Sequence, residues 1–327
     1  MPSVTFSRNV FIPLTNVCRN RCGYCGFRRD IGHPEAKLLS PEEVTDILSR
    51  GARAGCSESL FTFGERPHEV PGFGVWLGKL GYDTIIDYLV DMCKLSIKIG
   101  LLPHSNPGIL ERMELEKLKP YNASMGLMLE TMAPVKAHSG CAGKVPAARI
   151  KTIELAGELG IPFTTGILVG IGETPKDRVR SIQVIKEMHK KYGHIQEVII
   201  QNFLPKSGTE MASWPAPGIR EMAETVMMAR DILPPDVALQ VSPNLIDPKE
   251  LIKCGASDLG GISPETIDYI NPECAWPKVS ELGAMLEVSL RERLPIYPQY
   301  VKRKWYSEEI ASLVHRLSDA EGFRKTY

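Results

Sequence analysis

The sequence predicts a TIM-type (β/α)8 barrel with a short C-terminal extension. Eight short apolar runs alternate with amphipathic stretches, and no low-complexity linker separates them. The chain has 327 residues, 43% of them apolar and 24% charged, which is enough for one barrel or for two ordinary domains. We prefer one barrel over residues 1–295, with a tail over residues 296–327 that packs on or beside it.

The predicted strands are short runs of mainly apolar residues. They cover 4–12, 57–64, 100–105, 123–130, 162–170, 197–204, 238–243 and 258–262. Two helix starts lie between them, because Ser40 precedes Pro41 and Thr174 precedes Pro175. A hydroxyl that caps the helix, followed by proline in its first turn, is typical of a helix start. We therefore expect helices to begin at Pro41 and Pro175.

The segment 66–81 is rich in glycine and proline and is too long for an ordinary turn between strand and helix. We expect it to form a loop over the mouth of the barrel. Functional groups of such barrels lie at the carboxyl ends of the strands. Motifs that end a predicted strand therefore have more weight than motifs on helices.

Composition limits the classes of partner. Lys plus Arg equal Asp plus Glu at 39 each, so no overall charge favours nucleic acid or an anionic membrane, and we expect a small-molecule substrate. No apolar run reaches the length of a membrane span, and the N-terminal stretch lacks the hydrophobic segment of a signal peptide, so we expect a cytoplasmic protein. Five scattered cysteines are then expected to be free thiols. They are Cys56, Cys93, Cys141, Cys254 and Cys274.

Three further cysteines form the most informative motif. Cys18, Cys22 and Cys25 lie in TNVCRNRCGYCGF with C-x3-C-x2-C spacing and no fourth partner. A structural zinc site or an electron-transfer cluster usually has four protein ligands, whereas three thiolates on a 4Fe-4S cluster leave one iron open to a small molecule. The alternatives are a chance cluster of buried cysteines, or a zinc site completed by a residue such as His33.

The cysteine spacing resembles the signature of the radical S-adenosylmethionine (SAM) enzymes. Tyr24 fits as well, since that family prefers an aromatic residue just before the third cysteine. The resemblance implies two cofactors: one 4Fe-4S cluster on Cys18, Cys22 and Cys25, and SAM bound to the open iron. A different class, a non-enzymatic iron–sulfur carrier or a zinc-binding interaction module, would lack a SAM pocket.

Acidic and basic residues follow predicted strands where a SAM ligand would lie. Glu65 in FTFGERP follows Gly64 and resembles the Gly-Glu motif that holds the methionine amino group. The resemblance assigns Glu130 in GLMLETM to the ribose hydroxyls and Arg149 to the methionine carboxylate, which a planar guanidinium can bind with two hydrogen bonds. Each could instead be a solvated surface charge.

A glycine-rich turn follows another predicted strand in GILVGIGE, residues 166–173. Glycine allows close backbone approach, and Gly170 and Gly172 can take a positive φ. The run lacks the P-loop lysine and the dinucleotide spacing. It resembles the G-x-I-x-G-x-x-E element whose backbone lies against the adenine of SAM, which implies contacts from Gly166, Val169 and Gly170. Such turns are common, so this motif alone is weak.

Polar residues at other predicted strand ends are candidates for substrate binding. They are His104, Ser105, Asn106, Gln201, Asn202, Ser242, Asn244 and Asp258. A pocket rich in hydrogen-bonding groups suits a polyhydroxylated or heterocyclic substrate. His104 is the candidate catalytic base, because imidazole ordinarily titrates near neutral pH. Any of these residues could simply cap a helix or turn.

An ordered set of motifs over nearly the whole chain resembles the small subunit of the FO synthases. The motifs are PLTNVCRNRCGYCGF, FTFGERP, PFTTGILVGIGET, QNFLPKSGT, SPNL and GASDLGGISPETIDYINPECAWP. The chain departs from that family in HSGCAGK around Cys141, where Ser-Pro is expected before Gly-Lys.

This resemblance implies an ammonia-releasing lyase that closes the deazaflavin ring of FO for coenzyme F-420. Its substrate would be a hydroxybenzyl–ribityl-diaminouracil adduct, with methionine and 5′-deoxyadenosine as further products. The implied partners are an electron donor such as ferredoxin or flavodoxin, and a companion adduct-forming subunit in transient contact. The alternatives within the architecture are that companion enzyme or a menaquinone-pathway cyclase.

Overall fold

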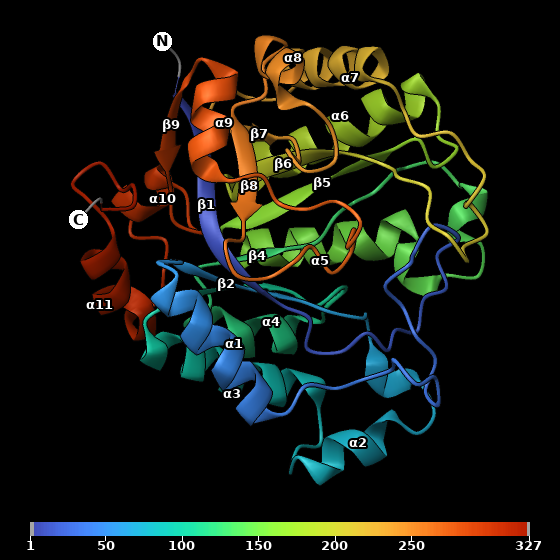
Figure 1. Cartoon of the computed structure of the whole chain (residues 1–327), viewed down its shortest axis with the longest axis vertical. Coiled ribbons are helices and arrows are strands. Elements are labelled where there is room, and N and C mark those ends of the chain that lie inside the picture. The colour runs from blue at the N-terminus through green and yellow to red at the C-terminus, as the bar shows by residue number, and fades with distance from the viewer. Residues whose placement is uncertain (1–2, 326–327) are drawn as a thin grey trace.

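The computed structural model, described for residues 3–325, is a closed barrel of eight parallel strands with helices outside it (Figure 1). The barrel closes because β1 pairs with β2 on one edge and with β8 on the other. The barrel strands are β1 (Ser3–Ile12), β2 (Glu58–Thr62), β3 (Leu102–Asn106), β4 (Ser124–Gly126), β5 (Phe163–Val169), β6 (Ile195–Asn202), β7 (Ala238–Gln240) and β8 (Asp258–Ile262). The predicted fold and all eight predicted strands are confirmed.

The strand that differs most from its predicted length is β4, which ends at Gly126 instead of continuing to residue 130. Glu130 has a φ of 68°, a left-handed conformation that interrupts an extended strand. It nevertheless forms an isolated parallel bridge with Ile167 of β5. The segment after β4 therefore bends but keeps Glu130 beside the barrel wall.

Helices follow the strands along the chain. They are α1 (Pro41–Arg53), α2 (Phe73–Lys79), α3 (Ile85–Ile99), α4 (Arg112–Leu118), α5 (Pro146–Glu158), α6 (Pro175–Tyr192), α7 (Ile219–Ile232), α8 (Pro248–Lys253), α9 (Val279–Leu286), α10 (Pro298–Lys302) and α11 (Glu308–Leu317). Ser40 and Thr174 each form a capping box, with Glu43 and Asp177 respectively, so both predicted helix starts are confirmed. Within residues 3–325, no helix is both long and apolar enough to cross a membrane.

The segment 66–81 is more ordered than a simple loop. It contains a 3-10 turn (Pro67–Glu69) and the short helix α2. Phe73 and Leu77, one helical turn apart, are both buried in the main core. The prediction of a loop is wrong for this helix, because glycine and proline form the turns around it while its two apolar residues anchor it.

The C-terminal segment closes the amino-terminal end of the barrel. A ninth strand, β9 (Ser289–Glu292), which the sequence did not suggest, pairs in parallel with β1. Beyond it, α10 and α11 form a second apolar cluster with Leu102 and Ala123, which lie at or next to the starts of β3 and β4. Figure 1 shows these red helices on the side opposite the blue loop that follows β1. The domain boundary at 295 stays a prediction.

Candidate active site

The loop after β1 brings the three clustered cysteines to the mouth of the barrel, where all three are half-buried. Backbone contacts hold the loop: the amide of Arg19 donates to the carbonyl of Glu65 at 3.0 Å, and the amide of Gly23 donates to that of Ala137 at 2.8 Å. The amide of Glu65 in turn donates to the Cys18 sulfur at 3.2 Å. The end of β2 and the cysteine loop are therefore one connected unit.

No three His, Cys, Asp or Glu side chains within residues 3–325 converge closely enough to hold a single metal ion. A four-iron cluster is larger than one ion and takes its thiolates on separate irons. Cys141 lies next to the loop, and a hydrogen bond with Cys22 lowers the pKa of Cys141 to about 6 while it raises that of Cys22. A fourth thiol is thus close to the three that the spacing singled out.

Glu65 is a buried carboxylate with four partners. Its oxygens accept hydrogen bonds from Asn20 at 2.8 Å, from Arg19 at 3.2 Å and from the amide of Ile109 at 3.2 Å, and Arg149 lies 3.4 Å away. Burial raises the pKa of Glu65, but Arg149 and Asn20 outweigh burial, so the net pKa is lowered. Glu65 is therefore an ionised group inside the protein, not a solvated loop charge.

Glycines make room for this carboxylate. A Cβ on Gly143 would lie 1.5 Å from Oε1 of Glu65, and one on Gly108 would lie 2.3 Å from its Cγ. Gly108 also has a φ of 86°. Only residues without a side chain fit at these two positions while Glu65 keeps its place.

Glu130 and Arg149 lie beside Glu65, so the structure brings together all three charged residues assigned to SAM. Arg149 is buried on α5 and donates from Nη1 to the carbonyl of Gly143 at 2.8 Å, while its Nη2 lies 3.7 Å from Glu130. Burial raises the pKa of Glu130, but the charges of Lys144 and Arg149 lower it by more. The net pKa of Glu130 is therefore below its usual value. The site therefore places two buried carboxylates against the buried Arg149 and the partly buried Lys144.

Three further residues of the site were not predicted from the sequence: Lys144, Asn20 and Arg19. Lys144 forms an ion pair with Glu130 and lies 5.9 Å from the centre of the Tyr24 ring. Asn20 links Glu65 to Gly143, because the amide of Gly143 donates a hydrogen bond to Oδ1 of Asn20 at 3.1 Å. Asn20 and Arg19 lie inside the cysteine motif, and that position was the available signal.

The glycine-rich turn after β5 is shaped by its own glutamate. Gly170 and Gly172 have φ of 97° and 105°, as the sequence predicted. The carboxylate of Glu173 accepts the amides of Gly170 and Ile171, both at 2.9 Å. Gly166 allows β5 and β6 to pack closely, because a Cβ there would lie 2.3 Å from the carbonyl oxygen of Ile199 on β6.

This turn lies beside the charged site. The amide of Glu130 donates to the carbonyl of Gly166, and the amide of Leu168 donates to the carbonyl of Glu130, both at 3.0 Å. Val169 ends β5, directly before the turn. The hydroxyl of Tyr24 lies 3.1 Å from Nε2 of His138 at the same mouth.

Five substrate candidates follow or end strands at the mouth. They are Asn106, Gln201, Asn202, Ser242 and Asn244. Asn202 and Asn244 each donate from the side-chain amide, to the carbonyl of Leu245 at 3.4 Å and to Asp268 at 3.0 Å. Their side-chain oxygens are buried and have no hydrogen-bond partner among the described residues. Two buried acceptors near the mouth are thus unpaired within the described structure.

The other three candidates lie elsewhere. Asp258 is the first residue of β8, at the amino-terminal end of the barrel, where Arg293 binds it. Ser105 contacts the Cys93 sulfur of α3 at 3.6 Å, so its side chain points out of the barrel. These two placements argue against substrate contact, because neither side chain reaches the mouth.

His104 is in the middle of β3, not at its end, and is buried. Its Nδ1 lies 2.6 Å from the hydroxyl of Ser124, which donates to the carbonyl of Pro295 in the C-terminal segment. Burial and the charge of Arg293 lower the pKa of His104 to about 3. Such an imidazole is a weak base at neutral pH, which argues against the catalytic assignment.

Comparison with known proteins agrees with this geometry. The sequence model described as the radical SAM superfamily matches residues 12–185. The chain is 63% identical to 7,8-didemethyl-8-hydroxy-5-deazariboflavin synthase of Methanococcoides burtonii, over 98% of both chains. It is 54% identical to the enzyme of that name from Archaeoglobus fulgidus, over 99% of this chain and 100% of the relative.

Solved structures share the fold. The FeFe-hydrogenase maturase HydG from Carboxydothermus hydrogenoformans superposes with a TM-score of 0.69 at 18% identity, over 96% of this chain and 78% of that one. Methylornithine synthase gives a TM-score of 0.63 at 19% identity, over 99% and 84%. The family match and the near full-length identity together show that this chain belongs to the radical SAM superfamily.

Proposed function

We propose that the protein is a radical SAM FO synthase, which closes the deazaflavin ring of 7,8-didemethyl-8-hydroxy-5-deazariboflavin in coenzyme F-420 biosynthesis. The observation that carries the proposal is the identity of 54% to 63% with synthases of that name over nearly the whole chain. The matched length covers 98% to 99% of this chain and so includes the residues that line the barrel mouth. The substrate is then the hydroxybenzyl–ribityl-diaminouracil adduct, and ammonia is released.

The residues at the mouth fit one 4Fe-4S cluster and SAM. Cys18, Cys22 and Cys25 are half-buried on a loop that backbone hydrogen bonds hold in place, and they would hold the cluster. When bound, the cluster and SAM would supply the radical chemistry that ring closure requires. Everything else the protein contributes is binding, orientation and exclusion of water.

Opposite charges at the site match the zwitterionic methionine part of SAM. Glu65 would accept hydrogen bonds from the amino group, and the guanidinium of Arg149 would bind the carboxylate, since the two side chains lie 3.4 Å apart. Glu130 would accept hydrogen bonds from the ribose hydroxyls. Lys144 and Arg149 lower its pKa, which keeps its carboxylate ionised. The backbone from Gly166 through Val169 to Gly170 would lie along adenine, and Tyr24 would pack at the cluster loop.

Free acceptors at the mouth fit the adduct. Its ribityl hydroxyls and ring N–H groups are donors, and the buried oxygens of Asn202 and Asn244 have no partner among residues 3–325. Asn106, Gln201 and Ser242 lie at the same end of the barrel. We assign substrate binding to these five residues.

The reaction also needs partners outside the chain. The cluster must be reduced before SAM can be cleaved, so the proposal includes a donor such as ferredoxin or flavodoxin. A cytoplasmic location would keep the five remaining cysteines reduced. Transient docking of the companion adduct-forming subunit follows from the pathway alone, and anaerobic co-purification without association, even with adduct present, would remove that part.

The test is anaerobic. The cluster is reconstituted, dithionite and SAM are added with and without the adduct, and 5′-deoxyadenosine and FO fluorescence are followed. Formation of both products only with adduct is the expected result. Cys22→Ala should abolish both, whereas Cys254→Ala, a matched change in a half-buried cysteine after α8, should retain them.

Two other outcomes separate the alternatives. Deoxyadenosine without FO would keep the radical SAM chemistry but assign another substrate, that of the companion subunit or of a menaquinone-pathway cyclase. Neither product from protein with a full cluster would instead support the non-enzymatic iron–sulfur carrier.

A further inference from the structure

We propose that Arg178 is a positioning residue for SAM. It holds Glu173, which shapes the glycine-rich turn after β5, and it connects that turn to α7. This inference rests on the proposed role of that turn in binding SAM. It adds a residue that makes no contact with the ligand itself.

Glu173 is the central part of this connection. Its side chain is 1% exposed, and its two oxygens accept the amides of Gly170 and Ile171, one each, at 2.9 Å. Gly170 has a φ of 97°, so these two amides point where an ordinary extended strand would not place them. The shape of the turn therefore depends on a carboxylate that is held in one place.

Arg178 provides the charge that such a buried carboxylate needs. It lies in the first turns of α6, its side chain is 7% exposed, and its Nε donates to Glu173 Oε1 at 2.7 Å. Without Arg178, Oε1 of Glu173 would lose its donor from α6, and the carboxylate would no longer be held in place against the two turn amides.

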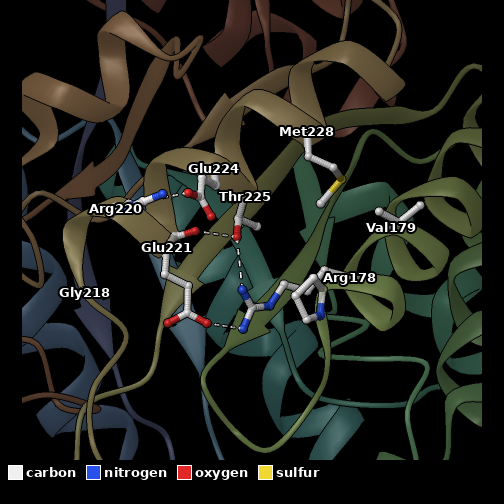
Figure 2. A pocket seen from close by; sticks show the side chains of 9 residues that line it. Arg178, Val179, Gly218, Arg220, Glu221, Glu224, Thr225 and Met228 are labelled. Atoms are coloured by element: carbon white, nitrogen blue, oxygen red, sulfur yellow. Dashed lines mark hydrogen bonds and ion pairs between the residues drawn. The ribbon is translucent and has the colours of Figure 1, made fainter.

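The other end of the guanidinium is attached to α7. Nη1 donates to the hydroxyl of Thr225 at 3.3 Å, and Nη2 donates to Glu221 at 2.5 Å. Figure 2 shows Arg178 pointing across the gap between the two helices toward these side chains. Thr225 is itself held, because its hydroxyl donates to the carbonyl of Glu221 at 2.7 Å. The three directions of the planar fork are thus all used, which a lysine ammonium cannot reproduce.

The chain of contacts from Glu173 through Arg178 ends at Glu221 on the surface. A substitution of Glu221 therefore weakens these contacts without disturbing the core. The groove between α6 and α7 has a volume of about 510 Å³, and Arg178 and Glu221 both line it. The Glu221 side chain is 44% exposed, so its truncation does not leave a cavity in the core. Arg220 lines the same groove, is 91% exposed and, among the described residues, pairs only with Glu224. It is therefore a matched control.

The experiment uses cluster-loaded protein and measures the Kd of SAM by anaerobic equilibrium dialysis. Arg178→Gln should raise Kd about tenfold, the usual effect of losing hydrogen bonds to a charged group, and Glu221→Ala about threefold. Arg220→Ala should leave Kd unchanged. Iron content should stay at the wild-type level in all three, and kcat at saturating SAM should change less than the KM for SAM.

A second measurement does not depend on either cofactor. Hydrogen–deuterium exchange of the peptide 166–173 should be faster in Arg178→Gln than in the wild type, because the amides of Gly170 and Ile171 lose their fixed acceptor. Exchange elsewhere in the barrel should not change.

Unchanged Kd and unchanged exchange in both Arg178→Gln and Glu221→Ala would overturn the inference while the proposed function stands. An equal fall of kcat, iron content and SAM affinity would also overturn it, because that pattern indicates general structural damage. If cluster-loaded wild-type protein does not bind SAM, the proposed function itself fails and takes this inference with it.

Discussion

Arg293 and Asp258 form a two-point ion pair beneath the barrel, with Nε 2.7 Å from Oδ2 and Nη2 2.8 Å from Oδ1. Nη2 also donates to Glu197 at 3.0 Å. All three side chains are buried. The residue that follows β9 therefore ties the C-terminal segment to the first residue of β8 and to the start of β6, through charges removed from water.

Removing this guanidinium should strongly destabilise the protein. Arg293→Ala leaves two buried carboxylates without their cation, so we expect the free energy of unfolding to fall by about 3–5 kcal/mol. Arg112→Ala is the matched control: its ion pair with Glu158 is half-exposed, and the expected loss is below about 1 kcal/mol. Urea unfolding of both variants measures the difference. Equal losses would show that the buried pair contributes no more than a surface pair.

Acid should weaken the fold through two buried histidines. Burial lowers the pKa of His104 and His194 to about 3, against about 6.5 in an unfolded chain. Between these values the unfolded state binds more protons, so stability falls as pH drops below about 6.5. Each histidine should cost about 2 kcal/mol between pH 7 and pH 5.

The variant His194→Asn tests this sign. Its stability should fall less steeply from pH 7 to pH 5 than that of the wild type, whereas replacement of the exposed His33 by Gln should keep the wild-type slope. Urea unfolding of cluster-free protein at several pH values gives both slopes. A His194→Asn slope as steep as the wild type would contradict the buried neutral imidazole.

Gly143→Ala should damage SAM binding without loss of the cluster. The added Cβ would lie 1.5 Å from Oε1 of Glu65 and 2.8 Å from the Asn20 amide nitrogen, so the carboxylate must move. We expect the Kd of SAM to rise at least about tenfold with unchanged iron content. Gly78→Ala on α2, where a Cβ meets nothing within 4 Å, should bind SAM like the wild type. Wild-type affinity in Gly143→Ala would show that Glu65 is not needed in its present place.

Iron analysis should separate ligands from neighbouring thiols. Cys22→Ala should lose iron after anaerobic reconstitution, because only three thiolates are available to the cluster. Cys141→Ala should retain the full iron content, although Cys141 lies close enough to Cys22 to alter its pKa. Loss of iron from Cys141→Ala would make that thiol a ligand and would contradict an iron left open for SAM.

Features encoded within a few residues could be predicted from the sequence. The capping boxes of Ser40 with Glu43 and of Thr174 with Asp177 form within one helical turn, so their residues alone specify where α1 and α6 begin. The spacing of Cys18, Cys22 and Cys25 likewise depends on one short loop. The eight apolar runs predicted the barrel, because each strand shows its buried character in its own sequence.

Features that depend on distant partners could not be predicted from local sequence. Glu65 and Arg149 are 84 residues apart, so their proximity was expected only from the family resemblance, and the closed barrel brings β2 and α5 together. Asp258 looked like a mouth residue until the start of β8 and the partner Arg293 placed it at the opposite end. Lys144, Arg178 and the strand β9 gain their roles in the same way. The barrel strands, the helix starts and the cysteine loop follow from local sequence, because each depends on residues that are close along the chain. Which charges meet follows from the folded arrangement, because pairing of charges depends on distance in space and not along the chain.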